Sequence, residues 1–210
     1  MSQVRTNCPQ CGAPVTFAWS SSVQTTCEYC HSVLVRHDVN IDRVGQVADL
    51  PVGVSPIQLR TEGIYNGKAF TVAGRILYEW ENGGWNEWHL MFQDGQSGWL
   101  SDAQAEYFIT FPAKAAAVLD PNNLVAGQAM ELNGHKLEVA TITRARYAGV
   151  EGELPFEYWD KNEVLFVDLR SHSGAFGTID YSETPPITFF GHAVQIEDLR
   201  LKNLREFEGW

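Results

Sequence analysis

The sequence is short of basic residues and of long apolar runs. Lysine and arginine total 15 against 26 aspartates and glutamates, which gives a formal net charge of −11 over 210 residues. A chain with this charge repels the phosphate backbone of nucleic acids unless a local basic surface overrides it. No apolar stretch approaches the roughly 20 residues of a membrane helix, and no apolar signal core follows the first five residues. We therefore expect a cytoplasmic protein that neither binds nucleic acid nor spans a membrane.

Recognisable catalytic motifs are also missing. The chain contains no Gly-x-Ser-x-Gly elbow, no His-Glu-x-x-His pair and no P-loop. His89 alternates with apolar neighbours and should face out from its sheet, and His172 lies in a Ser-His-Ser-Gly turn. The sequence therefore predicts no catalytic residue, because the histidines and nearby aspartates form no recognisable constellation: His89, His135, His172, His192, Asp94, Asp168 and Asp180.

Cysteine is absent after residue 30, and its four occurrences form two C-x2-C pairs separated by fifteen residues. Each pair is typical of a tight turn that aims two thiolates at one point, and two such turns complete a tetrahedral zinc site. Gly12 suits the chain reversal after the first pair, and residues 15–19 and 33–35 have the pattern of short strands. We predict a zinc ribbon over residues 1–45, with one structural Zn²⁺ per chain held by Cys8, Cys11, Cys27 and Cys30.

A disulfide pair and a redox-active C-x-x-C motif are the alternatives for these cysteines. Thiols stay reduced in the cytoplasm, which disfavours the first, and no strand-to-helix context accompanies the second. His31 and His37 could replace a cysteine, but four thiolates already complete the shell, so we expect both histidines to face solvent. The charged side chains of residues 1–45 cancel, so the ribbon has no basic rim. This favours a structural or protein-contacting role over nucleic-acid binding.

Beyond the ribbon, strand patterns dominate. Prolines and glycines interrupt residues 44–56, where we place the domain boundary. The first predicted strand, residues 70–80, alternates and should place one apolar set on one face: Phe70, Val72, Ile76, Tyr78 and Trp80. A turn at 81–84 leads to a second strand at 85–92, and a turn at 94–95 leads to a third at 98–100. The best helix candidate is short and runs from Pro112 to Leu119.

The body contains an internal similarity. Residues 65–72 and 132–139 share an Asn-Gly turn followed, two residues later, by an alternating strand, and residues 87–94 resemble residues 162–169. The two matching segments lie farther apart along the chain in the second pair than in the first. The second copy must therefore carry an insertion, which we place around residues 149–160. Chance similarity between ordinary hairpins is the alternative.

These patterns predict a mainly β fold. We expect the N-terminal zinc ribbon to be followed by two related small β units with little helix, each an SH3-like barrel or a sheet. The units are residues 57–125, called the first unit below, and residues 126–210, the second unit. Together they should form one compact body.

Aromatic side chains crowd the first unit. Trp80 and Trp85 flank the turn at residues 81–84, and Trp88 follows closely. Tryptophans at a turn are poorly placed for burial in their own sheet, so we predict that Trp80, Trp85 and Trp88 form an exposed surface that binds a partner. The alternative is a set of aromatic cross-strand pairs in a barrel core.

Several strings resemble one family. Residues 8–15 read Cys-Pro-Gln-Cys-Gly-Ala-Pro-Val, residues 70–80 contain Gly-Arg-Ile-Leu-Tyr-Glu-Trp, and Trp-Asn-Glu-Trp follows at 85–88. Gly-Trp-Leu-Ser at 98–101 and Thr-Ile-Asp-Tyr-Ser at 178–182 complete the pattern. On these strings the chain resembles, over essentially its whole length, the bacterial domain-of-unknown-function family numbered 4178.

The resemblance implies no chemistry, since that family has no established activity. Its members are similar to genes found beside phage-shock-type membrane-stress proteins and spermidine-synthase-like enzymes, which implies an accessory role in a stress-response or polyamine-linked system. We expect a non-catalytic zinc-ribbon adaptor that binds a protein partner. The alternative is a binder or enzyme acting on a small cationic ligand such as a polyamine, attracted by the acidic body.

Overall fold

The N-terminal part of the chain folds as two small sheets. The computed structural model describes residues 4–37, 40–46, 55–114, 120–157 and 162–207. One sheet pairs two strands: β1 (Val4–Asn7) and β2 (Pro14–Phe17). The other has three: β3 (Gln24–Thr26), β4 (Ser32–His37) and β5 (Asn40–Gln46). Strands β2 and β4 confirm the two strands predicted beside the cysteine pairs, and β5 runs into the stretch at residues 44–56 where we placed the boundary.

The rest of the described chain is mainly β, as predicted. The first unit supplies five strands: β6 (Glu62–Tyr65), β7 (Lys68–Trp80), β8 (Gly83–Phe92), β9 (Ser97–Ala103) and β10 (Glu106–Pro112). The second supplies five more: β11 (Ala129–Leu132), β12 (His135–Gly152), β13 (Glu163–Arg170), β14 (Ala175–Asp180) and β15 (Ile187–Val194). Two short 3-10 helices accompany them: η1 (Pro121–Asn123) and η2 (Ile196–Leu199).

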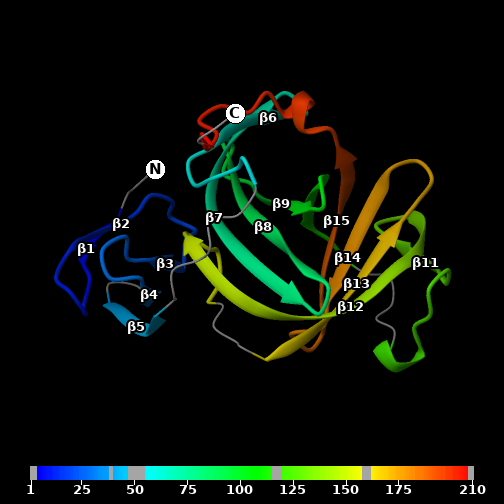
Figure 1. Ribbon diagram of the computed structural model, residues 1–210, viewed down its shortest axis with the longest axis horizontal. Coiled ribbons are helices and arrows are strands. Elements are labelled where there is room, and N and C mark those ends of the chain that lie inside the picture. Colours follow the sequence, from blue (N-terminus) through cyan, green and yellow to red (C-terminus); the bar gives the residue numbers. More distant parts are fainter. Residues whose placement is uncertain (1–3, 38–39, 47–54, 115–119, 158–161, 208–210) are drawn as a thin grey trace.

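Eight of these strands close into one antiparallel barrel. Around the ring they follow the order β7, β8, β9, β10, β15, β14, β13, β12, and β12 pairs with β7 to close it (Figure 1). The two units are therefore not separate SH3-like barrels. Each four-stranded meander alone has two open edges. The pairing of β10 with β15 and of β7 with β12 supplies hydrogen-bond partners for the backbone groups of all four edge strands.

The internal similarity in the sequence coincides with equivalent strands of the two units. The Asn-Gly turns at Asn66 and Asn133 join β6 to β7 and β11 to β12. Both asparagines have positive φ, 49° and 52°, as a two-residue hairpin requires. In each unit a short hairpin strand thus precedes four barrel strands. The stretch around residues 149–160, where we placed the insertion, includes the end of β12, which pairs with β7 and then reaches the ribbon (Figure 1).

Strand β7 carries a bulge that changes which side chains share a face. The register with β8 shifts between Val72 and Gly74, so alternation restarts there. Phe70 and Val72 pack on the outer side of the barrel, whereas Ile76 and Tyr78 point into it. The prediction that residues 70–80 place one apolar set on one face was therefore wrong.

The predicted helix at 112–119 was wrong where the structure describes it. Pro112 is the last residue of β10, and the Ala113 amide donates a hydrogen bond to the Thr188 carbonyl oxygen at 2.8 Å. The segment therefore continues extended beside the sheet, because this backbone group is satisfied by a neighbouring strand. Residues 115–119 lie outside the described residues.

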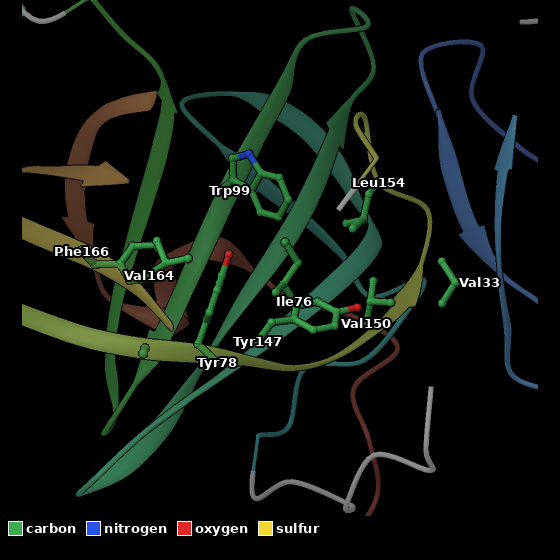
Figure 2. Packing of buried hydrophobic residues seen from close by; sticks show 10 residues of the cluster. Val33, Ile76, Tyr78, Trp99, Tyr147, Val150, Leu154, Val164 and Phe166 are labelled. Carbon is green, nitrogen blue, oxygen red and sulfur yellow. The ribbon is translucent and has the colours of Figure 1, made fainter. Parts of the chain in front are cut away.

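Apolar side chains gather inside the barrel and on two parts of its outer surface. Inside, Ile76, Tyr78 and Trp99 pack with Phe166 and other residues of β12 and β13. Figure 2 shows this cluster, with Val33 of the ribbon reaching toward Val150 and Leu154. Outside, one cluster is covered by residues around Ile57 and by η2, and another by residues around Leu124 and by β11. Within the described residues, no helix is long and apolar enough to cross a membrane.

Candidate functional site

The four cysteines converge on one point. All four Sγ atoms lie within 4.8 Å of one another. The Sγ atoms of Cys8 and Cys30 are 3.7 Å apart, and those of Cys11 and Cys27 are 3.8 Å apart. A tetrahedral ion with metal–sulfur bonds of about 2.3 Å requires sulfur–sulfur edges of about 3.8 Å. The donor set therefore fits a tetrahedral metal ion, and a possible metal site lies where the spacing predicted one.

The two cysteine turns have the same backbone geometry. In each, the amide four residues after the first cysteine donates to that cysteine's carbonyl oxygen: Gly12 to Cys8 at 2.9 Å and His31 to Cys27 at 3.0 Å. Both donors have positive φ, 75° for Gly12 and 56° for His31. His31 thus occupies the position of the first turn's glycine and is exposed, as we expected, rather than replacing a thiolate.

The ribbon is joined to the barrel through the residues that follow β12. Glu153 is buried, and its carboxylate accepts hydrogen bonds from the amides of Ala18 at 2.8 Å and Trp19 at 3.3 Å. Next to it, Leu154 and Gln24 exchange backbone hydrogen bonds at 2.9 and 3.1 Å. A Cβ atom at position 74 would collide with the Glu153 carbonyl oxygen, so this approach requires Gly74.

A cavity of about 340 Å³ lies within the barrel. Eight-stranded barrels have an interior that side chains can fill or that can hold one small ligand. Nine aromatic side chains line the cavity: Tyr78, Trp80, Trp85, Trp99, Phe108, Phe156, Phe166, Phe176 and Phe189. Its exposed lining residues mark the opening: Trp80, Gly84, Gln104, Glu106, Thr141 and Arg170.

Glu87 lies on the inner face of β8. Its carboxylate accepts hydrogen bonds from the Ser101 hydroxyl at 2.8 Å and from the Trp85 indole N–H at 3.1 Å. Burial raises the pKa of Glu87 to about 8, and the nearby negative charges of Asp168 and Asp102 add to this effect. Glu87 is therefore largely protonated at neutral pH.

Asp168 lies on the inner face of β13. Its carboxylate accepts a hydrogen bond from the Thr141 hydroxyl at 2.9 Å and another from Thr178. Burial raises the pKa of Asp168, while these hydroxyls and the positive charge of Arg170 lower it. Asp180 also lines the cavity and is buried, which raises its pKa as well. The cavity therefore holds three carboxyl groups supported mainly by uncharged donors.

Among the described lining residues, the one cationic side chain, Arg170, is engaged at the opening. Arg170 donates two hydrogen bonds to the carboxylate of Glu106, at 2.7 and 3.3 Å. Its guanidinium also lies over the ring of Phe108, 4.9 Å from the centroid. No described residue forms an ion pair with Glu87 or Asp168. The described lining residues therefore comprise four carboxyl groups and one base, an excess of acidic groups.

The three tryptophans predicted to bind a partner occupy different places. Trp80 is 36% exposed, and both it and the half-buried Trp85 line the cavity. Trp88 is 0% exposed and packs with the outer cluster, beneath the guanidinium of Arg75 at 5.1 Å. The prediction of an exposed Trp88 was therefore wrong, because side chains alternate along β8 and this face is covered by the segment around Ile57.

The histidine and aspartate candidates do not gather in one site. His89 was expected to face solvent but is 0% exposed. Its Nδ1 lies 2.9 Å from the Glu153 carbonyl oxygen, which can only accept, so this nitrogen carries the proton and Nε2 accepts from Ser97 at 2.8 Å. Burial lowers the pKa of His89 to about 4. The structure gathers only two of the other candidates, Asp168 and Asp180, in the cavity, and leaves four exposed: Asp94, His135, His172 and His192.

Sequence reasoning missed Glu87 and its hydroxyl partner Ser101. A signal was present, because Glu87 lies two residues from the aromatic residue Trp85 and so shares its face of the strand. Asp168 lies two residues from Phe166 in the same way. A carboxyl group on the apolar face of a strand is a candidate functional group. Only the closure of the barrel, however, brings these two strands to one cavity.

Comparison with known proteins identifies the barrel region. A family model described as a domain of unknown function (DUF4178) matches residues 58–195. The match begins after the ribbon and includes every strand from β6 to β15. No curated protein and no solved structure matches the chain. The predicted resemblance is therefore confirmed for the barrel, and the function has to be argued from the cavity and the cysteine cluster.

Proposed function

We propose that this chain, which belongs to the DUF4178 family of domains of unknown function, binds a small organic cation inside its barrel. The observation that supports this proposal is the composition of the cavity. Glu87 and Asp168 face an interior lined by nine aromatic rings, with no described cationic partner of their own. This is the cationic-ligand function that the acidic body suggested, moved from the outer surface to the interior.

The charges of the cavity select against other ligand classes. An anion would meet four carboxyl groups and one arginine that Glu106 already engages. A neutral sugar would need several donors, but the Trp85 indole N–H and the Ser101 hydroxyl are already directed at Glu87. Carboxylates only accept when ionised, so the matching ligand is one that donates hydrogen bonds and carries positive charge, such as an amine.

The aromatic rings suit the same ligand. Tyr78, Trp85 and Phe166 contact one another with ring centroids 4.9–5.5 Å apart, and all three line the cavity. The face of an aromatic ring attracts ammonium groups and packs well against methylene groups. An alkylammonium ion could thus bury its chain against these rings and direct its charge at a carboxylate.

We assign a structural role to the ribbon. Four thiolates leave no open coordination position, which is typical of structural zinc and unsuited to metal catalysis. Bound zinc would hold the two cysteine turns together and thereby the ribbon's fold. A cytoplasmic location belongs to the same proposal, since that compartment keeps the thiols reduced.

Calorimetric titration of the zinc-loaded protein tests the cation proposal. The ligands are n-butylamine, its neutral analogue n-butanol and its anionic analogue butyrate, each at millimolar concentration. We expect heat of binding only with the amine, and its loss in Glu87→Gln combined with Asp168→Asn. Glu163→Gln, on the exposed side of β13, is the control and should bind normally. Equal binding of the three ligands, or none with the amine, would contradict the proposal.

A protein-binding adaptor role is the second candidate. It is favoured by Tyr29, which lies between Cys27 and Cys30 and is 69% exposed. An exposed aromatic residue on a rigid metal-bound turn is a suitable anchor for a partner. Tyr29→Ser should abolish partner capture from native cells while zinc content stays at one per chain. Capture that is unchanged in this variant would exclude the ribbon turn as the contact.

A further inference from the structure

The two units place equivalent carboxyl groups in the cavity. In the first unit, the second and third barrel strands are β8 and β9. Glu87 on β8 lies opposite Ser101 on β9 and accepts a hydrogen bond from its hydroxyl. In the second unit, Asp168 on β13 lies opposite Thr178 on β14 and also accepts a hydrogen bond from its side chain. These are again the second and third barrel strands. Each unit therefore contributes one carboxyl–hydroxyl pair at the same position of its meander.

The order of the ring puts these pairs on opposite walls. From β9 to β14 the ring passes through β10 and β15, and from β8 to β13 it passes through β7 and β12. Two strands thus separate the pairs in both directions. Because inner-facing side chains of a barrel point toward its axis, Glu87 and Asp168 approach the cavity from opposite sides.

Apolar surface adjoins both carboxyl groups. Trp85 is two residues from Glu87 on the same face of β8, and Phe166 is two residues from Asp168 on β13. These two rings contact each other edge-to-face, 5.5 Å between centroids. The cavity therefore has a carboxyl group on each wall and a shared aromatic surface beside them.

We propose that the ligand is a linear dication with an ammonium group at each end, one for the carboxylate of each unit. This inference rests on the proposed function and specifies its ligand class. The methylene chain lies along the aromatic rings, and each ammonium group donates to one carboxylate and is charge-paired there. A monoamine leaves one of the two carboxyl groups without a cation.

Proton release provides a second readout in the unaltered protein. Glu87 is held mostly protonated by burial and by the charges of Asp168 and Asp102, and its direct contacts, Ser101 and Trp85, are uncharged. A dication that pairs with both carboxylates must therefore displace the Glu87 proton to solvent at pH 7. A monoamine can pair with Asp168 alone and displace less.

Titration calorimetry of matched ligands on the zinc-loaded full chain tests the inference. The pairs are 1,4-diaminobutane with n-butylamine, 1,5-diaminopentane with n-pentylamine, and 1,6-diaminohexane with n-hexylamine. We expect at least one diamine to bind about tenfold or more tightly than its monoamine, a difference of about 1.4 kcal/mol. Glu87→Gln and Asp168→Asn should each reduce the diamine to its monoamine's affinity, while Glu163→Gln should leave the difference unchanged.

Repeating the wild-type titrations in two buffers of different ionisation enthalpy counts the released protons and does not depend on the folding of any variant. We expect more proton release with the diamine than with the monoamine. Equal affinity and equal proton release within every pair would overturn the dication inference and leave the cation-binding function standing. Absence of binding by all six amines would overturn the proposed function itself, and this inference with it.

Discussion

The ribbon and the barrel are stabilised by different means. The ribbon's cluster has five buried residues, and two of them, Cys8 and Cys27, are thiols of the metal site. The barrel instead has three apolar clusters, one inside and two outside its ring. Burial of apolar surface can therefore hold the barrel, whereas a module with as small a core as the ribbon's usually needs a bound metal to fold. We therefore expect the ribbon to depend on a metal and the barrel not to.

The two regions also differ in whether their functional groups leave room for a ligand. Four thiolates around one metal ion would complete its coordination and leave no position for a ligand. In the barrel, Glu87 and Asp168 accept hydrogen bonds from hydroxyl and indole donors and form no ion pair with a described residue. In our proposal the metal therefore serves the ribbon's structure, and the ligand site belongs to the barrel.

Loss of the metal is expected to have the largest effect, and it should be confined to one region. Cys8→Ser combined with Cys27→Ser should abolish zinc binding and unfold the ribbon, because structural zinc contributes on the order of 10 kcal/mol to such modules. Native mass spectrometry should show one zinc in the wild type and none in the variant. Hydrogen exchange should accelerate at residues 4–37 and remain slow in the barrel strands.

His31→Gly is the control for the metal experiment. It keeps all four thiolates and the left-handed backbone conformation, so zinc content and exchange rates should match the wild type. Equal loss of protection in β7 to β10 of the double cysteine variant would show that the barrel, too, depends on the metal and would break the comparison.

The next largest effect is expected in the barrel's outer core. Trp88→Ala should reduce the free energy of unfolding by about 3–5 kcal/mol, because it removes a fully buried indole. Trp80→Ala, at the exposed hairpin, should cost less than about 1 kcal/mol. Urea unfolding monitored by circular dichroism measures both. A small change for Trp88→Ala would instead return this residue to the surface that the sequence predicted.

The junction between the two regions should show an intermediate effect. Glu153→Gln replaces one acceptor oxygen by an amide that cannot accept from Ala18 or Trp19, at an expected cost of about 1.5–3 kcal/mol. Glu28→Gln, which breaks the exposed ion pair with Arg60, should cost less than about 1 kcal/mol. Urea unfolding that places both variants within error of each other would show that the buried junction does not join the regions.

The smallest effect concerns pH. Burial holds the pKa of Glu87 at about 8 in the folded chain against an ordinary value of 4.5, so the folded state binds more protons between these values. Stability from this group is present below about pH 4.5 and is lost as pH rises through 8. Glu87→Gln stays neutral and should therefore be more stable than wild type above pH 8, on the order of 1 kcal/mol, but not at pH 5.

Thermal unfolding between pH 5 and pH 9 checks this difference, with Glu163→Gln as the exposed control. Parallel curves for wild type and Glu87→Gln would show that the carboxyl group is not confined inside the barrel.

Local features were predictable from the sequence, and long-range closure was not. The cysteine spacing and the Asn-Gly turns specify structure within a few residues, so two of the five ribbon strands, β2 and β4, and the hairpins at the two Asn-Gly turns were predicted. The pairing of β7 with β12 joins segments about 70 residues apart and leaves no local pattern. Without that closure, two units with open edges were as reasonable as one ring, and no cavity could be anticipated.

Faces of strands were predictable only where alternation is unbroken. The bulge after Val72 exchanges the two faces of β7, so the side chains that follow it point to the opposite side of the sheet. Nothing in the alternation of residues 70–80 indicates this exchange. His89 was expected to face solvent because it alternates with apolar neighbours, yet the Glu153 carbonyl oxygen and Ser97 supply both of its partners inside the fold. Polar residues with buried partners distant in sequence are the ones that pattern reasoning misplaces.

Chemical-shift mapping of the tryptophan indole N–H groups tests most directly whether the barrel interior is the ligand site. The probe is 1,4-diaminobutane, added to the zinc-loaded chain at pH 7. Trp85 and Trp99 line the cavity, whereas Trp88 packs outside the barrel and Trp19 lies in the ribbon. We predict that the signals of Trp85 and Trp99 move with a saturable dependence on ligand and that those of Trp88 and Trp19 do not. Unmoved signals of Trp85 and Trp99 at millimolar ligand, or shifts confined to Trp19, would contradict the account.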